Sequence, residues 1–191
     1  INYSEFFKPW EDERALFTHT IPLIGRQGLI ADLNAFLKSN KSWGLLSGRG
    51  GVGKSKILFE YAKRISKKGP QKILFARDGI TLGKEASQEI PSVPCLIVVD
   101  DAHRRDDLSV FFAILRDKPE AKLLLSTRPH GKDRILTVGQ QQGVGHDHMI
   151  DLGLLEALST EETVKLAESV LGAKFKSYAR LLAQITRDCP L

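Results

Sequence analysis

The sequence predicts an α/β fold in three layers, with a five-stranded parallel sheet between helices and a small helical lid at the C-terminal end. Short apolar runs that suit buried strands alternate with longer segments whose apolar residues recur every three or four positions, as on one face of a helix. A glycine-rich turn joins the first of these strands to the helix after it. Such an alternation implies parallel strands joined by right-handed crossovers.

The N-terminal third of the chain sets out this pattern. Residues 1–20 mix aromatic side chains with acids, and we expect this lead-in to pack on the core. Residues 21–27 predict a short extended segment with a turn, and residues 27–38 have the apolar spacing of an amphipathic helix. The strand over residues 43–47 follows, and the helix after the glycine-rich turn ends at Gly69-Pro70.

The rest of the chain continues the alternation. Further apolar segments predict strands over residues 72–77, 95–100, 121–127 and 148–153. Helices are predicted over segments that include residues 108–115, 159–171 and 175–188. The stretch 78–94 is polar and has room for a loop with about one helical turn. Either Ser159 or Thr160 can cap the first of the two closing helices.

Composition places the chain among ordinary globular proteins. It has 191 residues, 42% of them hydrophobic and 27% charged, which argues against disorder. No apolar stretch approaches the roughly 20 residues of a membrane helix, and 2 cysteines do not make a disulfide framework. We therefore expect a cytoplasmic protein without membrane contact. The net charge of +5 suits phosphate binding; it permits nucleic-acid contact without indicating it.

The ends of the sequence suggest a piece of a longer protein. The chain starts at Ile1, its single methionine is Met149, and it stops at Leu191 just after the last predicted helix. We expect three parts: a lead-in over residues 1–20, a nucleotide-binding core over residues 21–153 and an incomplete helical lid over residues 154–191.

The glycine-rich turn carries the strongest chemical signal. Its sequence GRGGVGKS fits the phosphate-binding pattern G-x-x-x-x-G-K-[ST] at every fixed position. Glycines let successive backbone N–H groups surround a phosphate, and the helix that follows adds its N-terminal dipole. In this pattern Lys54 would reach the β- and γ-phosphates of ATP or GTP, and Ser55 would hold Mg²⁺. We assign the loop's cofactor contacts to Gly48, Arg49, Gly50, Gly51, Val52, Gly53, Lys54, Ser55 and Lys56.

The apolar strand CLIVV is followed directly by two acids, Asp100 and Asp101. Acids at the carboxyl end of a buried strand face the crevice in which α/β proteins bind ligands. Asp100 would hold Mg²⁺ through water, and Asp101 would polarise the water that attacks the γ-phosphate. The alternative is an acidic pair that caps the next helix. The presence of the phosphate-binding loop GRGGVGKS (the P-loop) favours the roles in Mg²⁺ binding and catalysis.

Arginines provide the last candidate group. Arg128 follows the strand LLLST, and its guanidinium would read the γ-phosphate oxygens bidentately. The alternative is a solvent-facing arginine at the start of a loop. Lys54, Asp101 and Arg128 form the candidate catalytic set. For Arg104 and Arg105 we favour a solvated helix start over an arginine finger.

The motifs PLIGRQ, GRGGVGKS, CLIVVDD, LLLSTR and DCPL, in this order, resemble those of the STAND ATPases. These are signal-transduction relatives of AAA+ proteins that include NB-ARC domains. The resemblance spans about residues 20–191 and implies a P-loop NTPase fold with the sheet order 5-1-4-3-2. It also implies contacts of the adenine and ribose with Leu23, Ile24, Gly25 and Arg26, and of the base with Pro190.

The resemblance further implies a regulatory switch that holds ADP, exchanges it for ATP and oligomerises, with slow Mg²⁺-dependent hydrolysis. Its partners would be the nucleotide, other copies of the parent protein, and sensor and effector domains outside this chain, an arrangement that suits signalling or defence. Two alternatives stay open. One is a DNA-handling AAA+-like ATPase such as a replication initiator or helicase loader, and the other is a nucleotide-binding scaffold without turnover.

Overall fold

A computed structural model describes residues 1–11, 21–67, 69, 72–83 and 85–186. Five parallel strands form one sheet in the order β2-β3-β4-β1-β5, which is the predicted order. The strands are β1 (Trp43–Gly48), β2 (Lys72–Phe75), β3 (Cys95–Val99), β4 (Ala121–Thr127) and β5 (Met149–Leu155). The predicted three-layer α/β fold is confirmed, with β2 two residues shorter and β5 two residues longer at their carboxyl ends than expected.

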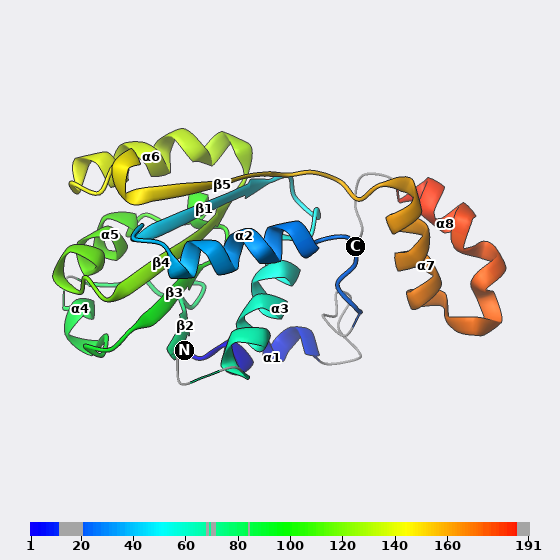
Figure 1. The fold of residues 1–191 in the computed structure, drawn as a ribbon, viewed down its shortest axis with the longest axis horizontal. Helices are drawn as coiled ribbons and strands as arrows, with labels where there is room; N and C mark the ends of the chain where they lie inside the picture. The colour runs from blue at the N-terminus through cyan, green and yellow to red at the C-terminus, as the bar shows by residue number, and fades with distance from the viewer. Residues whose placement is uncertain (12–20, 68, 70–71, 84, 187–191) are drawn as a thin grey trace.

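Helices cover both faces of the sheet (Figure 1). On one face lie α1 (Tyr3–Glu11), α2 (Gln27–Lys38) and α3 (Lys54–Ser66), whose apolar residues pack with Leu46 and Leu124 of the sheet. On the other face lie α5 (Leu108–Asp117) and α6 (Lys132–Gln141), which pack around Trp43. Because both faces are covered, β1 and β3 are buried at every position, as central parallel strands require.

Helix α6 lies between β4 and β5, where the sequence predicts no helix. Only Ile135 and Gly139 of this helix are buried, so its apolar periodicity is weak. Gly139 allows the close approach, because a Cβ atom there would lie 3.2 Å from the Trp43 ring and 3.3 Å from the carbonyl oxygen of Val144. The Trp43 indole in turn donates a hydrogen bond of 2.8 Å to that carbonyl. The helix is thus held by tertiary contacts that leave little trace in its own sequence.

The described part of the N-terminal lead-in packs on the core, as predicted. The backbone of Ile1 pairs with Phe75 at the end of β2, through hydrogen bonds of 2.7 and 3.1 Å. Phe6 and Phe7 of α1 are buried, and both rings contact Phe75. The N-terminal residues therefore extend the apolar layer that covers the β2 edge of the sheet.

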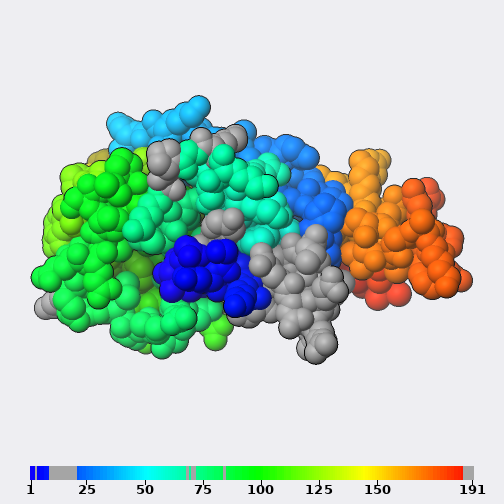
Figure 2. Space-filling view, turned by 90° about the horizontal axis from the view of Figure 1, so that it is seen from below, coloured from blue at the N-terminus to red at the C-terminus, as the bar shows by residue number. Residues whose placement is uncertain are grey.

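The C-terminal helices form a separate lobe at one end of the molecule (Figures 1 and 2). Helix α7 (Thr160–Phe175) starts with a capping box between Ser159 and Glu162, so Ser159 is the cap. The helix is interrupted at Gly172, whose φ of 68° lies in the left-handed region, and α8 (Ala179–Ile185) returns along it. The predicted pair of closing helices is present, with α8 shorter than the predicted 175–188 within the described residues.

The polar stretch after β2 contains one short helix, α4 (Ala86–Glu89), as expected for about one helical turn. Short 3-10 turns η1 (Ala102–Arg104) and η2 (Pro129–Gly131) follow β3 and β4. Within the described ranges, no helix is long and apolar enough to cross a membrane.

Candidate nucleotide-binding site

The P-loop connects β1 to α3 through a turn that only glycine adopts easily. Gly51 has a φ of 75° and Gly53 a φ of 100°, both in the left-handed region that side chains disfavour. A Cβ atom on Gly48 would lie 2.9 Å from Cγ1 of Val52, so this glycine is needed for close packing rather than for its dihedral angles. The loop therefore folds back on itself just before the N-terminus of α3, where the helix dipole favours an anion.

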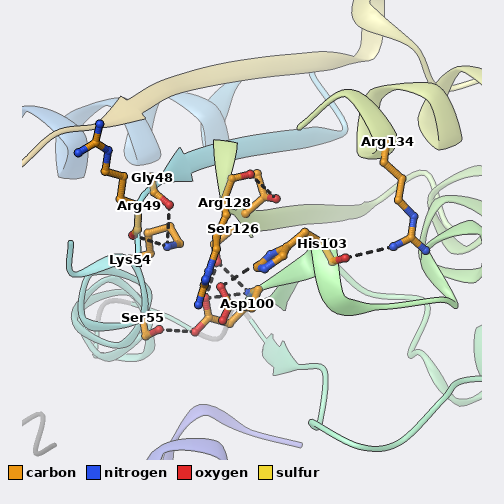
Figure 3. A network of polar contacts seen from close by, with 11 residues as sticks. Gly48, Arg49, Lys54, Ser55, Asp100, His103, Ser126, Arg128 and Arg134 are labelled. Carbon is orange, nitrogen blue, oxygen red and sulfur yellow. Dashed lines mark hydrogen bonds and ion pairs between the residues drawn. The ribbon is translucent and has the colours of Figure 1, made fainter. Parts of the chain in front are cut away.

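Lys54 turns its side chain back over this loop. Its ammonium group donates hydrogen bonds of 2.9 Å to the carbonyl oxygens of both Gly48 and Arg49 (Figure 3). Burial lowers the pKa of Lys54, while the charges of Asp101 and Asp100 oppose this effect. The lysine is thus buried and positioned between the loop and the acids at the end of β3.

Asp100 is the point at which three elements of the site meet. The Ser55 hydroxyl at the start of α3 donates a hydrogen bond of 2.5 Å to Oδ2 of Asp100, and the Ser126 hydroxyl of β4 donates to Oδ1 (Figure 3). The Ser126 oxygen also accepts a hydrogen bond of 3.0 Å from the backbone N–H of Asp101. Burial raises the pKa of Asp100, and the hydrogen bonds from the two serines oppose the rise.

Asp101 is held in an unusual backbone conformation. Its φ of 47° and ψ of 44° are left-handed, and it is the one such non-glycine residue in the described part of the chain. This conformation costs a residue with a Cβ atom about 1–2 kcal/mol, and such residues concentrate at functional sites. The Asp101 side chain is 36% exposed, so its carboxylate is reachable from solvent.

Arg128 lies beside the P-loop at Gly50. A Cβ atom on Gly50 would stand 3.6 Å from Cζ of the Arg128 guanidinium. Arg128 directly follows β4 and is exposed, which leaves its guanidinium available to a ligand. That distance is ordinary van der Waals contact, so the guanidinium packs directly against the loop at Gly50.

The segment before α2 lines the site and contacts both the P-loop and the C-terminal lobe. The guanidinium of Arg26 donates hydrogen bonds to the carbonyl oxygens of Glu156, at 2.7 Å, and Val52, at 3.5 Å. Burial lowers the pKa of Arg26, and the nearby charge of Glu162 opposes this. Gly25 has a φ of 70°, and a Cβ atom there would lie 2.1 Å from Oε1 of Glu162. This segment therefore bridges the P-loop and the first turn of α7.

One cavity of about 700 Å³ joins these groups, a size suited to a small ligand such as a nucleotide. Of the residues predicted for the site, those that line the cavity are Leu23, Ile24, Arg26, Gly50, Gly51, Val52, Gly53, Lys54, Ser55, Lys56, Asp100, Asp101 and Arg128. Gly25, Gly48 and Arg49 are not among its lining residues. Pro190 lies outside the described residues.

The structure adds lining residues that the sequence analysis does not predict. The loop from Asp78 to Thr81 forms one wall, and Phe6 and Phe7 of α1 contribute to another. Leu158 and Leu166 bring the C-terminal lobe to the cavity. None of these residues belongs to a motif with recognisable spacing, so only the packing of distant segments places them at the site.

A buried ion pair fixes the loop that carries Asp78 and Thr81. The Arg105 guanidinium donates hydrogen bonds of 2.8 and 2.7 Å to the two carboxylate oxygens of Asp107. It also donates to the carbonyl oxygens of Arg77, at 3.1 Å, and Ile80, at 2.6 Å. The Arg105 side chain is only 10% exposed, so the predicted solvated helix start is wrong for this residue. Its two carbonyl partners, Arg77 and Ile80, lie 28 and 25 residues earlier in the chain, beyond the reach of local sequence patterns.

The oxygen donors at Ser55 and Asp100 suit Mg²⁺. Magnesium prefers hard oxygen ligands and keeps several waters, so one hydroxyl and one carboxylate are sufficient protein ligands beside a phosphate. The two donors converge within hydrogen-bond distance. In the part of the chain that the structure describes, no cluster of three or more His, Cys, Asp or Glu residues offers an alternative metal site.

Comparisons with known proteins identify the fold. No family model matches the chain, and neither does any curated protein. Thermotoga maritima RuvB, described as a Holliday junction branch migration motor, matches with a TM-score of 0.62 and 14% identity over 87% of this chain and 58% of its own. Saccharomyces cerevisiae Hsp104 bound to casein matches with a TM-score of 0.68 and 16% identity over 98% of this chain and 36% of its own.

A further Hsp104 structure, with ATPγS and FITC casein, has a TM-score of 0.67 and 18% identity over 98% of this chain and 37% of its own. The chain therefore shares the α/β fold of these RuvB and Hsp104 structures, in agreement with the predicted P-loop NTPase fold. It spans about three fifths of the length of RuvB and little more than a third of that of Hsp104.

Proposed function

We propose that this chain is a nucleotide-binding ATPase domain that takes ATP or ADP with Mg²⁺. The observation that carries the proposal is the single cavity lined by Lys54, Ser55, Asp100, Asp101 and Arg128, which come from the ends of three adjacent strands. Each of these side chains has the chemistry that one part of a nucleoside triphosphate requires. Similarity of fold to AAA+ P-loop ATPases supports the same assignment.

Binding would begin with the phosphates. The backbone N–H groups of the P-loop and the N-terminus of α3 supply partial positive charge, and Lys54 supplies a full charge beside them. Ile24 and Arg26 line the cavity at the end toward α7, where the base and ribose would lie. The negative phosphates would favour the charged form of Lys54, which burial alone disfavours.

Ser55 and Asp100 would hold Mg²⁺, which supplies neutralising charge to the phosphate oxygens when bound. The Ser126 hydroxyl orients the Asp100 carboxylate, because it donates to the oxygen that Ser55 does not contact. Arg128 lies over Gly50 and would place its guanidinium at the γ-phosphate.

In the hydrolysis step, Asp101 would act as the general base for the attacking water. The water oxygen forms a bond to the γ-phosphorus while the bond from that phosphorus to the bridging oxygen of ADP breaks. Asp101 accepts the proton that the water loses, and its partly exposed carboxylate lines the cavity where this water would stand. The products are ADP and inorganic phosphate.

At the finer level, we propose a regulatory switch of the STAND type with slow turnover and nucleotide-dependent self-association. The support is the ordered set of motifs together with the contact between the segment at Gly25 and the first turn of α7. Leu158 and Leu166 line the same cavity, so a bound nucleotide would touch both the core and the C-terminal lobe. Nucleotide exchange would then change how the lobe sits on the core.

The test is nucleotide binding by isothermal titration calorimetry with Mg²⁺ present. Lys54→Ala removes the buried ammonium, and hydrogen bonds to charged groups contribute about 1.5–3 kcal/mol, so ATP affinity should fall about 10- to 100-fold. Lys67→Ala, an exposed lysine just after α3, is the matched control and should bind as the wild type does. Equal affinity of the Lys54→Ala variant and the wild type would overturn the proposal.

A DNA-handling ATPase is the second candidate function. Two observations support it: the similarity of fold to RuvB and the net charge of +5. DNA binding through phosphate contacts weakens steeply with salt, by about 10³-fold or more between 50 and 200 mM for six contacts. Fluorescence anisotropy with duplex and four-way-junction DNA across this range measures the slope. A lack of binding at low salt would exclude this candidate.

A further inference from the structure

His103 lies in the 3-10 turn η1, just beyond the two acids that end β3. Its Nδ1 atom is buried, and within the described ranges it is the one buried side-chain nitrogen or oxygen atom without a hydrogen-bond partner. That atom stands 3.9 Å from Oδ1 of Asp101. Buried polar atoms are nearly always hydrogen-bonded, so this exception requires an explanation.

The imidazole is fixed on several sides. The Arg134 guanidinium donates a hydrogen bond of 3.1 Å to the carbonyl oxygen of His103 (Figure 3). A Cβ atom on Gly131 would lie only 2.2 Å from the Cβ atom of His103, so η1 and η2 pack tightly at this point. The His130 ring stands perpendicular to the His103 ring at 5.1 Å. These contacts leave His103 little freedom to find another partner.

Asp101 is the more exposed member of the pair, because its side chain is 36% exposed whereas that of His103 is 9% exposed, so the carboxylate has more room to change its rotamer. Catalytic hydrogen bonds are often long before the substrate binds and shorten in the complex. Burial lowers the pKa of His103, and the charge of Asp101 opposes this, so the two groups interact electrostatically at their present separation.

We propose that His103 is a positioning residue for Asp101, with its Nδ1–H donating a hydrogen bond that orients the carboxylate toward the attacking water. The inference rests on the proposed ATPase function. His103 does not line the nucleotide cavity, so it acts through Asp101 rather than on the substrate. Because η2 directly follows Arg128, the same packing ties the orientation of the acid to the arginine that would read the γ-phosphate.

The first test needs no hydrolysis. Long-range ¹H–¹⁵N spectra of the wild type at about pH 8, where an imidazole is neutral, should show His103 as the Nδ1–H tautomer. The His103→Asn variant assigns the signal by its loss, and Asp101→Asn should shift it. An Nε2–H tautomer whose signal does not respond to Asp101→Asn would overturn the inference.

The second test is single-turnover hydrolysis by three variants. An asparagine amide nitrogen replaces Nδ1 and a glutamine amide nitrogen replaces Nε2, so His103→Asn should restore most of the rate that His103→Leu and His103→Gln lose. We expect that loss to be about 10-fold or more, by analogy with the 10- to 100-fold cost of removing a group that orients a metal ligand, with ATP affinity unchanged. His146→Leu, at the amino end of the sheet, is the control.

The outcomes separate the two proposals. A wild-type rate in His103→Leu, or no difference between His103→Asn and His103→Gln, would overturn the positioning role while leaving the ATPase function in place. If the wild type binds ATP and does not hydrolyse it, the proposed hydrolysis fails, and the tautomer measurement still decides whether His103 holds Asp101.

Discussion

At the scale of single residues, the site depends on hydroxyl groups as much as on charges. Asp100 has one oxygen bonded to Ser55 and the other to Ser126, so its carboxylate cannot rotate without breaking a hydrogen bond. The Ser126 oxygen also accepts from the backbone of Asp101 and thereby supports the left-handed conformation of that residue. One buried serine therefore fixes both the carboxylate of Asp100 and the backbone of Asp101.

Ser126→Ala should accordingly weaken the binding of Mg²⁺ at the nucleotide site without unfolding the protein. Groups that orient a metal ligand typically contribute 10- to 100-fold in metal affinity, so the Mg²⁺ concentration for half-maximal ATP binding should rise about 10-fold or more. Titration of Mg²⁺ at fixed ATP measures this shift. Ser109→Ala, exposed on α5, is the control, and an unchanged midpoint in Ser126→Ala would contradict this role.

Single residues also differ in whether the local sequence predicts their place in the site. Lys54, Ser55 and the two acids were predicted because each lies in a short motif whose glycines or flanking strand make its position recognisable. His103 adjoins such a motif, yet its burial depends on Gly131, which lies 28 residues further along the chain. The short spacing DDAH was the only signal available for it, and spacing alone does not show which atom is buried.

At the scale of elements, the loop after β2 is held by a helix start rather than by its own sequence. Arg105 and Asp107 form a buried bidentate pair, and the Asp107 carboxylate also accepts a hydrogen bond of 2.7 Å from the backbone N–H of Leu82. Burial raises the pKa of Asp107, but the hydrogen bonds from Arg105 and Leu82 lower it more, so its pKa lies below the ordinary value. This pair fixes one wall of the cavity.

Asp107→Asn should lower the free energy of unfolding at pH 7 by about 3 kcal/mol, because it leaves Arg105 buried without a counter-charge. A lowered folded-state pKa means that the stabilisation is present above the unfolded pKa of about 3.9 and is lost as pH falls through the folded value. The difference between variant and wild type in urea unfolding should therefore shrink below about pH 4.

The neighbouring residue provides a matched control for this experiment. Asp106 pairs with Arg134 at 3.1 Å but its side chain is 95% exposed, so Asp106→Asn should cost less than about 1 kcal/mol. Equal destabilisation by the two substitutions, or a difference for Asp107→Asn that does not change with pH, would contradict the assignment of the buried pair.

Elements differ in how far their sequences predict them. Helix α2 was predicted with its observed bounds, because Ile30, Leu33 and Phe36 repeat at helical spacing and are buried on one face. Helix α6 was missed, because few of its residues are buried and its position depends on Trp43 and Val144. Elements that carry their own apolar face are predictable, whereas elements held by a few distant contacts are not.

At the scale of the whole molecule, the parallel sheet brings the functional residues together. β1, β3 and β4 are adjacent in the sheet, so the segments that follow their carboxyl ends converge on one cavity although they lie far apart in sequence. The order 5-1-4-3-2 came from the resemblance to a family rather than from residue patterns, and the structure confirms it. The C-terminal lobe completes the cavity through Leu158 and Leu166, which no motif indicated.

The central claim is that this cavity binds and hydrolyses ATP with Mg²⁺, and single-turnover hydrolysis with excess protein tests it most directly. We predict that the wild type converts bound ATP to ADP and phosphate, and that EDTA abolishes the reaction. Asp101→Asn should bind ATP with little change but react about 100-fold or more slowly, because it loses the proton acceptor for the attacking water. Failure of the wild type to bind ATP, or hydrolysis at an equal rate by Asp101→Asn, would contradict the account.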